Sequence, residues 1–209
     1  MKPPAIILAG GRSTRMGGRD KCLLPIGGKP LLDHILGIVR PQACDILINT
    51  NSDPAPFLEF GHPILPDVIA DFQGPLSGLL TGMRWSRHRH PHAVHILSVA
   101  SDTPSLPRDL VTKLAQALVD QNADIAIASC DEGTHPTIGL WPVDLAERLQ
   151  DDLMETGTRS MHAWLRAFRV CHAEFPSSTM TNMNTLEDVR NFKPGAGIPS
   201  NIQPRPHLS

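Results

Sequence analysis

The chain has 209 residues, of which 41% are hydrophobic and 19% are charged, which is enough for one well-buried core and short for two. Lys and Arg total 19 and Asp and Glu total 21, a formal net charge of −2 that excludes a protein coating nucleic acid or a membrane surface through global positive charge. No apolar run approaches the roughly 20 residues of a membrane helix. Any anionic ligand must therefore be held by a local cluster of cations.

The start of the chain and the cysteines favour a cytoplasmic protein. Two prolines break the apolar stretch near the start, and basic residues follow where a signal peptide has its cleavage site. Cys22, Cys44, Cys130 and Cys171 form no C-x-x-C pair, which is typical of reduced thiols rather than of a disulfide framework or a zinc site. We therefore expect no secretion.

Short aliphatic runs alternate with segments of helical period along most of the chain. The strand predictions cover 5–8, 46–48, 94–99 and 125–128, and the helix predictions cover 76–83, 110–118 and 161–168. This alternation predicts an α/β fold, a three-layer α/β/α, Rossmann-like domain with a mostly parallel sheet over residues 1–192. We expect a more irregular lobe over roughly 134–174. Residues 193–209 are rich in Pro and Gly and have almost nothing apolar to bury, so we expect a disordered tail.

The loop after the first predicted strand carries the strongest functional signal. In an open parallel sheet, ligands bind outside the carboxyl ends of the strands, so such loops are the place to search. Glycines let the backbone present N–H groups to an anion, and nearby cations add positive charge, which together predict a polyphosphate cradle. The glycines and cations of this loop are Gly10, Gly11, Gly17, Gly18, Arg12, Arg15, Arg19 and Lys21.

Two better-known phosphate motifs are absent from this loop. A Walker A loop needs Gly-Lys followed by Ser or Thr, whereas Gly28-Lys29 leads into Pro30. The dinucleotide fingerprint G-x-G-x-x-G is missing as well. On the residues alone, the alternative of a Gly-rich surface loop with solvated arginines stays open.

A second candidate is Asp102, which follows the predicted strand 94–99. Pro104 and Pro107 end the strand and start the next helix, which leaves Asp102 in a strand-end loop. A carboxylate that faces a polyphosphate is repelled unless a cation lies between them, and Mg²⁺ takes one or two carboxylates together with phosphate oxygens. The alternative is an aspartate that caps the helix near Pro107.

Four histidines cluster at His88, His90, His92 and His95. Such a tract resembles a metal-binding cluster. The arginines between them repel a dication, and no Cys or carboxylate accompanies the histidines. We therefore expect no specific metal site here.

The order of the polar motifs is similar to that of a known family. Over roughly residues 5–190 it resembles the molybdenum cofactor guanylyltransferases, within the nucleotide-sugar-type nucleotidyltransferases. Two departures are Cys22, where glycine is common, and Ala100-Ser101, in place of the more usual Pro-Cys. The segments that carry the resemblance are Leu8-Ala9-Gly10-Gly11, Arg15-Met16-Gly17-Gly18, Asp20-Lys21, Asn49-Thr50-Asn51, Asp67, Asp71, Gly74-Pro75-Leu76-Ser77-Gly78, Asp102-Thr103-Pro104, Thr134-His135-Pro136 and Asn182-Met183-Asn184-Thr185.

The resemblance implies an enzyme that transfers GMP from GTP to molybdopterin, in its molybdenum cofactor form, and releases pyrophosphate. It implies that residues 1–130 bind GTP, that 131–192 face the pterin, and that the cofactor is Mg²⁺. The implied catalytic residues are Arg15, Lys21 and Asp102, with Asp102 as the metal ligand. The implied nucleotide-binding residues are Leu8, Ala9, Gly10, Gly11, Lys21, Asn49, Asp67 and Asp102. The implied pterin-binding residues are Gly78, His135, Arg159, Asn182 and Asn184.

The partners expected from this resemblance are GTP, the pterin and cofactor-insertion or molybdoenzyme-maturation proteins. We expect a monomer that binds neither nucleic acid nor membrane. Two alternative functions stay open. One is a related nucleotidyltransferase, such as a molybdopterin cytidylyltransferase or a sugar-phosphate nucleotidyltransferase. The other is a non-catalytic module that binds a nucleotide or delivers the cofactor.

Overall fold

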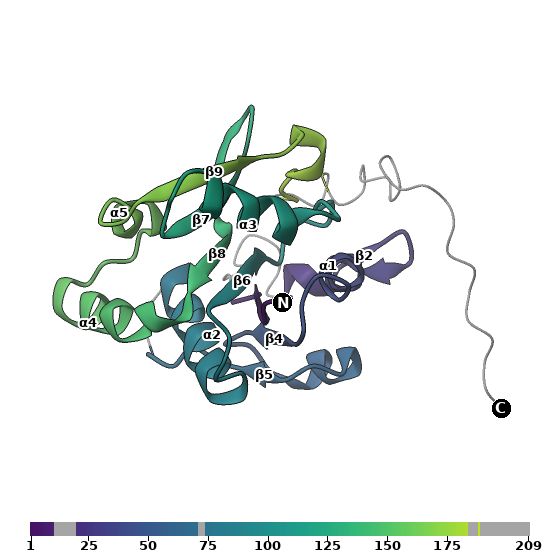
Figure 1. The fold of residues 1–209 in the computed structure, drawn as a ribbon. Coiled ribbons are helices and arrows are strands. Elements are labelled where there is room, and N and C mark those ends of the chain that lie inside the picture. Colours follow the sequence, from purple (N-terminus) through teal and green to yellow (C-terminus); the bar gives the residue numbers. More distant parts are fainter. Residues whose placement is uncertain (11–19, 71–73, 184–187, 189–209) are drawn as a thin grey trace.

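The computed structural model describes residues 1–10, 20–70, 74–183 and 188. Its centre is a seven-stranded sheet in the order β5-β4-β1-β6-β8-β7-β9, with helices on both faces (Figure 1). The strands of this sheet are β1 (Ala5–Leu8), β4 (Ile46–Asn49), β5 (Ile64–Leu65), β6 (His95–Ala100), β7 (Ile125–Cys130), β8 (Gly133–Pro142) and β9 (Val170–Glu174). The α-helices are α1 (Leu31–Val39), α2 (Pro75–Arg89), α3 (Leu110–Asp120), α4 (Ala146–Thr156) and α5 (Met161–Leu165). Shorter elements are the hairpin β2 (Pro25–Ile26) and β3 (Lys29–Pro30), and the 3-10 helices η2 (Lys21–Leu23), η3 (Ala55–Phe60), η4 (Val143–Leu145) and η5 (Ser177–Thr179).

One strand of the large sheet, β8, runs against the others. Strand β1 pairs in parallel with β4 and β6, β4 pairs in parallel with β5, and β7 pairs in parallel with β9. Strand β8 is antiparallel to both of its neighbours, β6 and β7. The expectation of a mostly parallel sheet is therefore confirmed.

Neighbouring side chains of the central strand β1 point into two separate cores. Ile7 packs with the apolar residues of α1 and α3, and Ile6 packs with those of α2, α4 and α5. Both isoleucines are fully buried. Because successive side chains of a strand point to opposite faces, this division confirms three layers with helices on each side of the sheet.

Residues 134–174 are more regular than the sequence pattern predicts. They contain most of β8, which lies between β6 and β7, followed by α4, α5 and β9. The first half of β8 is exposed or half-buried, and the second half is buried. The expectation of an irregular lobe is therefore wrong, because the polar first half of β8 hides a strand that enters the core only from Ile138 onward.

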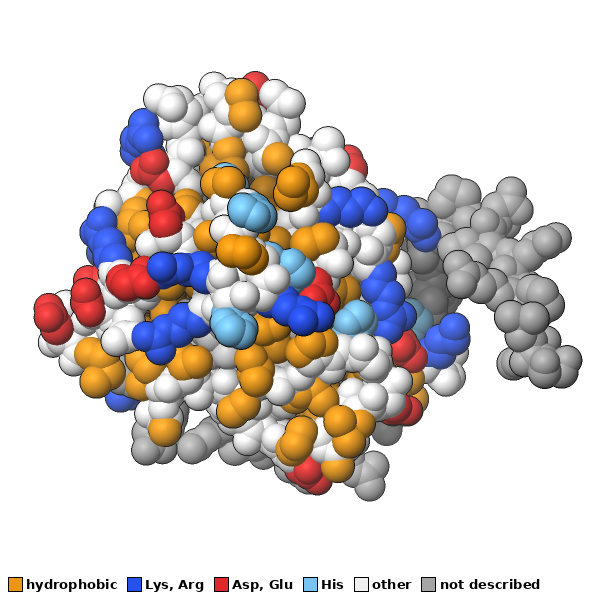
Figure 2. Space-filling model, turned by 60° about the horizontal axis from the view of Figure 1, so that its bottom comes forward, with side chains coloured by type: hydrophobic (Ala, Val, Ile, Leu, Met, Phe, Trp, Pro, Cys, Tyr) orange, Lys and Arg blue, Asp and Glu red, His pale blue; other side chains and the backbone are white. Residues whose placement is uncertain are grey.

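The described surface mixes charges of both signs. Figure 2 shows lysines, arginines, acidic residues and histidines interspersed among apolar side chains on the face turned forward. His90 of the histidine tract donates a hydrogen bond from its Nε2 to Asp45 Oδ2 at 3.1 Å, and its ring lies edge-on to Trp85. Among the described helices, none is long and apolar enough to cross a membrane.

Candidate active site

The carboxyl ends of β1, β4 and β6 lie side by side at one edge of the sheet. Leu8, the last residue of β1, pairs with Asn49 of β4 on one side and with Ala100 of β6 on the other. Just beyond the strand, the N–H of Ala9 donates to the carbonyl of Asn49 at 2.8 Å. The segments that follow these three strands therefore meet at one edge, where open parallel sheets bind their ligands.

Lys21 and Asp102, far apart in the sequence, form an ion pair at this edge. Lys21 Nζ lies 3.6 Å from Asp102 Oδ2, and the two side chains are 18% and 31% exposed. Lys21 begins the 3-10 helix η2, and the preceding Asp20 accepts a hydrogen bond from Ser52 Oγ at 2.8 Å. An ion pair that stays open to water is weakly held, so both groups can exchange it for ligand contacts.

Three of the predicted site residues lie outside the residues that the structure describes. Gly11 and Arg15 fall in the segment 11–19, and Asn184 falls in the segment 184–187. Their predicted roles therefore stay predictions. The described part of the loop ends at Gly10, whose Cα lies against the polar side chains that follow β4, since a Cβ there would stand 3.7 Å from Asn51 Nδ2.

A network of two amides and one carboxylate lies after β4. Asn49 Nδ2 donates to the Leu65 carbonyl at 3.2 Å and to Asp67 Oδ1 at 3.0 Å. Asn51 Nδ2 donates to Asp67 Oδ2 at 3.0 Å, and the Asp67 N–H donates to Asn51 Oδ1 at 2.8 Å. Asn49 is buried, whereas Asp67 is half-buried and Asn51 is exposed. The structure therefore brings the predicted Asn49 and Asp67 into contact at the sheet edge.

Helix α2 presses its first turn onto this network. A Cβ on Gly78 would stand 2.4 Å from Asn49 Oδ1 and 2.8 Å from Leu8 Cδ2, distances that no side chain tolerates. Gly78 is buried, and the contacts that explain this glycine are those with Asn49 and Leu8. Its predicted contact with the pterin stays a prediction.

The turn at Asp102 is held by a distant segment. The N–H of Met183 donates to the Asp102 carbonyl at 2.8 Å. Thr103 is fully buried, and its Oγ1 donates to Asn182 Oδ1 at 2.7 Å. Helix α3 begins at Leu110 with Asp109 at its N-cap position, so the alternative of Asp102 as the cap of that helix is wrong. The predicted Asn182 thus lies beside the predicted metal ligand.

His135 also lies within the electrostatic reach of Asp102. Its Nε2 is 3.4 Å from Cys130 Sγ, across the β7–β8 hairpin. Burial lowers the pKa of His135, and the carboxylates of Glu132 and Asp102 act in the opposite direction. The imidazole is therefore neutral near pH 7, and its strand β8 adjoins β6 on the side away from β1 and the Asn49–Asp67 network.

Arg159 lies at the start of helix α2. Gly74, the residue before this helix, has a φ of +151°, and a Cβ there would stand 3.0 Å from the Arg159 carbonyl. Both the backbone conformation and the close approach require glycine at this position. The structure therefore brings the predicted Arg159 to the same helix end as Gly78.

Comparison with known proteins identifies the family. Residues 5–170 match the model of the MobA-like NTP transferase domain. The chain belongs to this family. A molybdenum cofactor guanylyltransferase of Nitrobacter hamburgensis is 38% identical over 192 residues, which cover 90% of this chain and 92% of the relative. One of Rhodopseudomonas palustris strain HaA2 is 42% identical over 191 residues, covering 90% of this chain and 89% of the relative.

Solved structures confirm the fold of this MobA-like transferase. The molybdopterin-guanine dinucleotide biosynthesis protein A of Archaeoglobus fulgidus superposes with a TM-score of 0.69 at 18% identity, covering 89% of this chain and 94% of that one. A CMP:2-keto-3-deoxy-manno-octonic acid synthetase superposes equally well, with a TM-score of 0.69 at 16% identity, covering 91% of this chain and 97% of that one. The three-layer, Rossmann-like nucleotidyltransferase architecture is therefore shared.

Cys22 of η2, which stands where glycine is common in the family, belongs to the buried core of this MobA-like transferase. Cys22 is 1% exposed, and its burial raises the pKa of the thiol to about 12. The thiol is therefore protonated at neutral pH and packs as a small apolar side chain. Cys22 belongs to the same core as Ile7 of β1 and directly follows Lys21 in η2.

Three residues of the edge were not singled out from the sequence. Asn51 belongs to a motif that carries the resemblance, but its spacing of two residues from Asn49 gave no sign that both amides hold Asp67. Thr103 follows the predicted Asp102, and Ser52 lies three residues after the predicted Asn49. Both act through hydrogen bonds to segments far along the chain. Spacing alone does not reveal such contacts.

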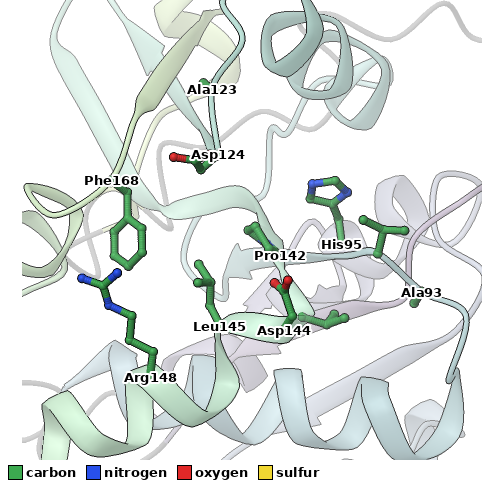
Figure 3. A pocket seen from close by; sticks show the side chains of 11 residues that line it. Ala93, His95, Ala123, Asp124, Pro142, Asp144, Leu145, Arg148 and Phe168 are labelled. Carbon is green, nitrogen blue, oxygen red and sulfur yellow. The ribbon is translucent and has the colours of Figure 1, made fainter.

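A hollow at the opposite edge of the sheet contains none of the predicted site residues. It has a volume of about 630 Å³ and is lined by residues that precede β6 and β7 or begin η4 and α4. Figure 3 shows Arg148 beside the Phe168 ring, with Asp144 and His95 on the other wall. Since ligands of this architecture bind at the carboxyl ends of the strands, the edge at Asp102 remains the candidate active site of this MobA-like transferase.

Proposed function

We propose that this chain transfers GMP from GTP to molybdopterin, in its molybdenum cofactor form, and releases pyrophosphate. The observation that carries the proposal is the meeting of the Lys21–Asp102 pair with the Asn49–Asp67 network at one sheet edge. One half of this arrangement suits a triphosphate and the other suits a base. Relatives that are 37–42% identical and cover most of the chain are molybdenum cofactor guanylyltransferases, which supports the proposal.

In the proposed reaction, an oxygen of the terminal phosphate of molybdopterin forms a bond to the α-phosphorus of GTP. The bond between the α-phosphorus and the bridging oxygen breaks, and pyrophosphate leaves with that oxygen and its electron pair. The attacking phosphate is already ionised, so the reaction needs no general base. Lys21, the Gly10–Gly11 amides and Arg15 would stabilise the negative charge that builds up on the β- and γ-phosphates.

The residues at this edge fit a magnesium ion that arrives with its nucleotide. Asp102 is the carboxylate that would hold it. The described residues contain no group of three or more His, Cys, Asp or Glu side chains arranged to hold a metal ion. This agrees with Mg²⁺, which takes one or two carboxylates and completes its shell with phosphate oxygens and water. When bound, the ion would supply positive charge against the negative charge of the phosphates, with Asp102 as the residue that would hold it.

We further propose that residues up to about 130 bind GTP and that residues 131–192 face the pterin. His135 and Asn182 lie next to Asp102, and Gly78 and Arg159 lie at the start of helix α2. With Asn184, they form the proposed acceptor wall. A cytoplasmic location, action as a monomer and hand-over of the product to cofactor-insertion or molybdoenzyme-maturation proteins belong to the same proposal.

A nucleotide panel tests the activity. The melting temperature of the protein is measured with GTP, CTP, UTP or ATP in the presence of Mg²⁺. In a separate assay, pyrophosphate release by the folded protein is measured with each nucleotide and molybdopterin. We expect thermal stabilisation and pyrophosphate release with GTP. Stabilisation and turnover with CTP instead would favour a molybdopterin cytidylyltransferase. Binding of GTP with no pyrophosphate release in the presence of molybdopterin would favour a cofactor-delivery module.

A further inference from the structure

Asn51 and Asp67 form a two-point contact that fixes the plane of a carboxylate at the base side of the edge. Asn51 Nδ2 donates to Asp67 Oδ2 at 3.0 Å, and the Asp67 N–H donates back to Asn51 Oδ1 at 2.8 Å. These two contacts also fix which end of the Asn51 amide is oxygen. The reverse assignment would set an oxygen against the carboxylate and an NH₂ group against the N–H.

Each oxygen of the Asp67 carboxylate holds one amide donor. Asn49 Nδ2 binds Oδ1 and Asn51 Nδ2 binds Oδ2, each at 3.0 Å. An ionised carboxylate has about four lone-pair positions, two on each oxygen. Counting the hydrogen bonds made by the described residues, one acceptor position remains on each oxygen, and both positions lie in the plane of the carboxylate.

Two adjacent acceptors match one standard base. Guanine presents N1–H and the exocyclic N2–H₂ side by side on its Watson–Crick edge. Adenine and cytosine place an acceptor nitrogen beside their amino group, and uracil places its single N–H between two carbonyls. A carboxylate that offers one free position on each oxygen therefore accepts two hydrogen bonds from guanine and is repelled by an acceptor atom of the other bases.

Asn51 restrains the rotation of the Asp67 carboxylate, which Asn49 alone does not. With only Oδ1 held, the carboxylate could rotate about its terminal torsion, which is soft in aspartate. The second amide on Oδ2, together with the backbone contact, removes that rotation before the ligand arrives. A group fixed in its binding orientation loses less conformational freedom when the ligand binds.

We propose that Asn51 is the positioning residue that sets the selectivity for the 2-amino group of guanine. It acts through Asp67 and does not itself touch the reacting atoms. This inference rests on the proposed function in that it takes the nucleotide to be GTP. It adds the residue that distinguishes GTP from ITP, which keeps N1–H and O6 but lacks the 2-amino group.

The test measures dissociation constants for GTP and ITP by calorimetry in the presence of Mg²⁺. It uses the wild-type chain, Asn51→Ala and the isosteric Asn51→Asp, which sets an oxygen against Asp67. Asp53→Ala is the matched control, because Asp53 lies in the same exposed segment and its side chain accepts a hydrogen bond from the N–H of Ala55 at 3.0 Å rather than contacting Asp67 in the described chain. The melting temperature of each variant confirms folding.

A hydrogen bond to a charged acceptor predicts that wild type prefers GTP over ITP by about 10-fold or more. We expect Asn51→Ala to reduce this preference by about fivefold or more, Asn51→Asp to reduce it further, and Asp53→Ala to leave it unchanged. Asn51→Ala affinities that fall by the same factor for GTP and ITP would overturn the inference, since a merely structural residue acts on both alike. Equal wild-type affinity for the two would overturn it as well, while leaving the proposed activity intact if pyrophosphate is still released from GTP. Failure of wild type to bind GTP at all would refute the proposed function itself.

Discussion

Replacing Gly78 by alanine tests whether the first turn of α2 keeps the base-side network in place. The new Cβ would stand 2.4 Å from Asn49 Oδ1 and 2.8 Å from Leu8 Cδ2. The Asn49 side chain cannot move aside without stretching its hydrogen bonds to Leu65 and Asp67. We therefore expect both the stability of the protein and its affinity for GTP to fall.

The magnitude follows from three contributions. Overpacking a buried position costs about 1–3 kcal/mol. Each weakened hydrogen bond of Asn49 costs about 1 kcal/mol. Alanine in a helix interior returns roughly 0.5–1 kcal/mol relative to glycine. The expected net loss in the free energy of unfolding is about 2–4.5 kcal/mol, accompanied by a loss of GTP affinity of about 10-fold or more because Asp67 loses one of its two amide donors.

Two other helical glycines serve as matched controls. A Cβ on Gly82, one turn along α2, would stand 2.8–3.0 Å from three atoms of Ile6, so Gly82→Ala should lose comparable stability without disturbing Asn49. Gly37 in α1 is exposed and has nothing within 4 Å of a Cβ, so Gly37→Ala should gain stability. Urea unfolding and calorimetry with GTP measure the two quantities. A Gly78→Ala protein with wild-type stability, or with a loss of GTP affinity no greater than that of Gly82→Ala, would refute the reasoning.

Three further predictions concern charge. Asp102→Ala should abolish pyrophosphate release while the melting temperature stays near that of wild type, because its ion pair with Lys21 is partly exposed and weak; a near-normal rate would remove Asp102 from the mechanism. Lys21→Ala should lower kcat/KM for GTP by removing the cation that pairs with Asp102, and an unchanged kcat/KM would contradict its phosphate role. Burial lowers the pKa of His62, His95 and His135 below the ordinary value of 6.5, so the unfolded chain takes up protons first as the pH falls. The free energy of unfolding should therefore be highest above about pH 6.5 and decline as the pH falls toward about 5.5. Urea titrations at several pH values measure this free energy. Constant stability over this range would contradict the assignment of neutral, buried imidazoles.

The parts of the fold that follow from local patterns could be predicted from the sequence. Strands β1, β4 and β7 and helices α2 and α3 lie where the apolar spacing places them. The hairpin β2–β3 was not predicted, although Gly27 and Gly28 with φ of +57° and +84° form the two-residue Gly-Gly turn typical of such hairpins.

The parts of the site that depend on long-range contacts could not be predicted in the same way. The sequence indicates Lys21 and Asp102 because each follows a strand in a recognisable motif. It does not indicate that Met183 holds the Asp102 carbonyl or that Asn51 holds Asp67, because neither contact has a period or a fixed spacing. The reversed strand β8 was missed for a related reason, since its polar first half resembles a loop until its pairing with β7 is known.

The reversed direction of β8 has a consequence for how such a protein can evolve. Because β8 runs against its neighbours, its first residues rather than its last lie at the edge that carries Asp102, joined to β7 by the tight turn after Cys130. The backbone pairing of β8 with β6 covers His95–Ser98, whereas the outer part of β8 pairs along its backbone with β7 and contacts β6 through the Ser98 hydroxyl, which donates to the Thr137 carbonyl at 2.8 Å. The proposed acceptor residue His135 lies in this outer part, on a different strand from Leu8 of β1 and Asn49 of β4, which belong to the proposed nucleotide side. On the proposed function, the residues for the acceptor and the residues for the nucleotide therefore lie on different strands, so that substitutions can change one specificity without the other.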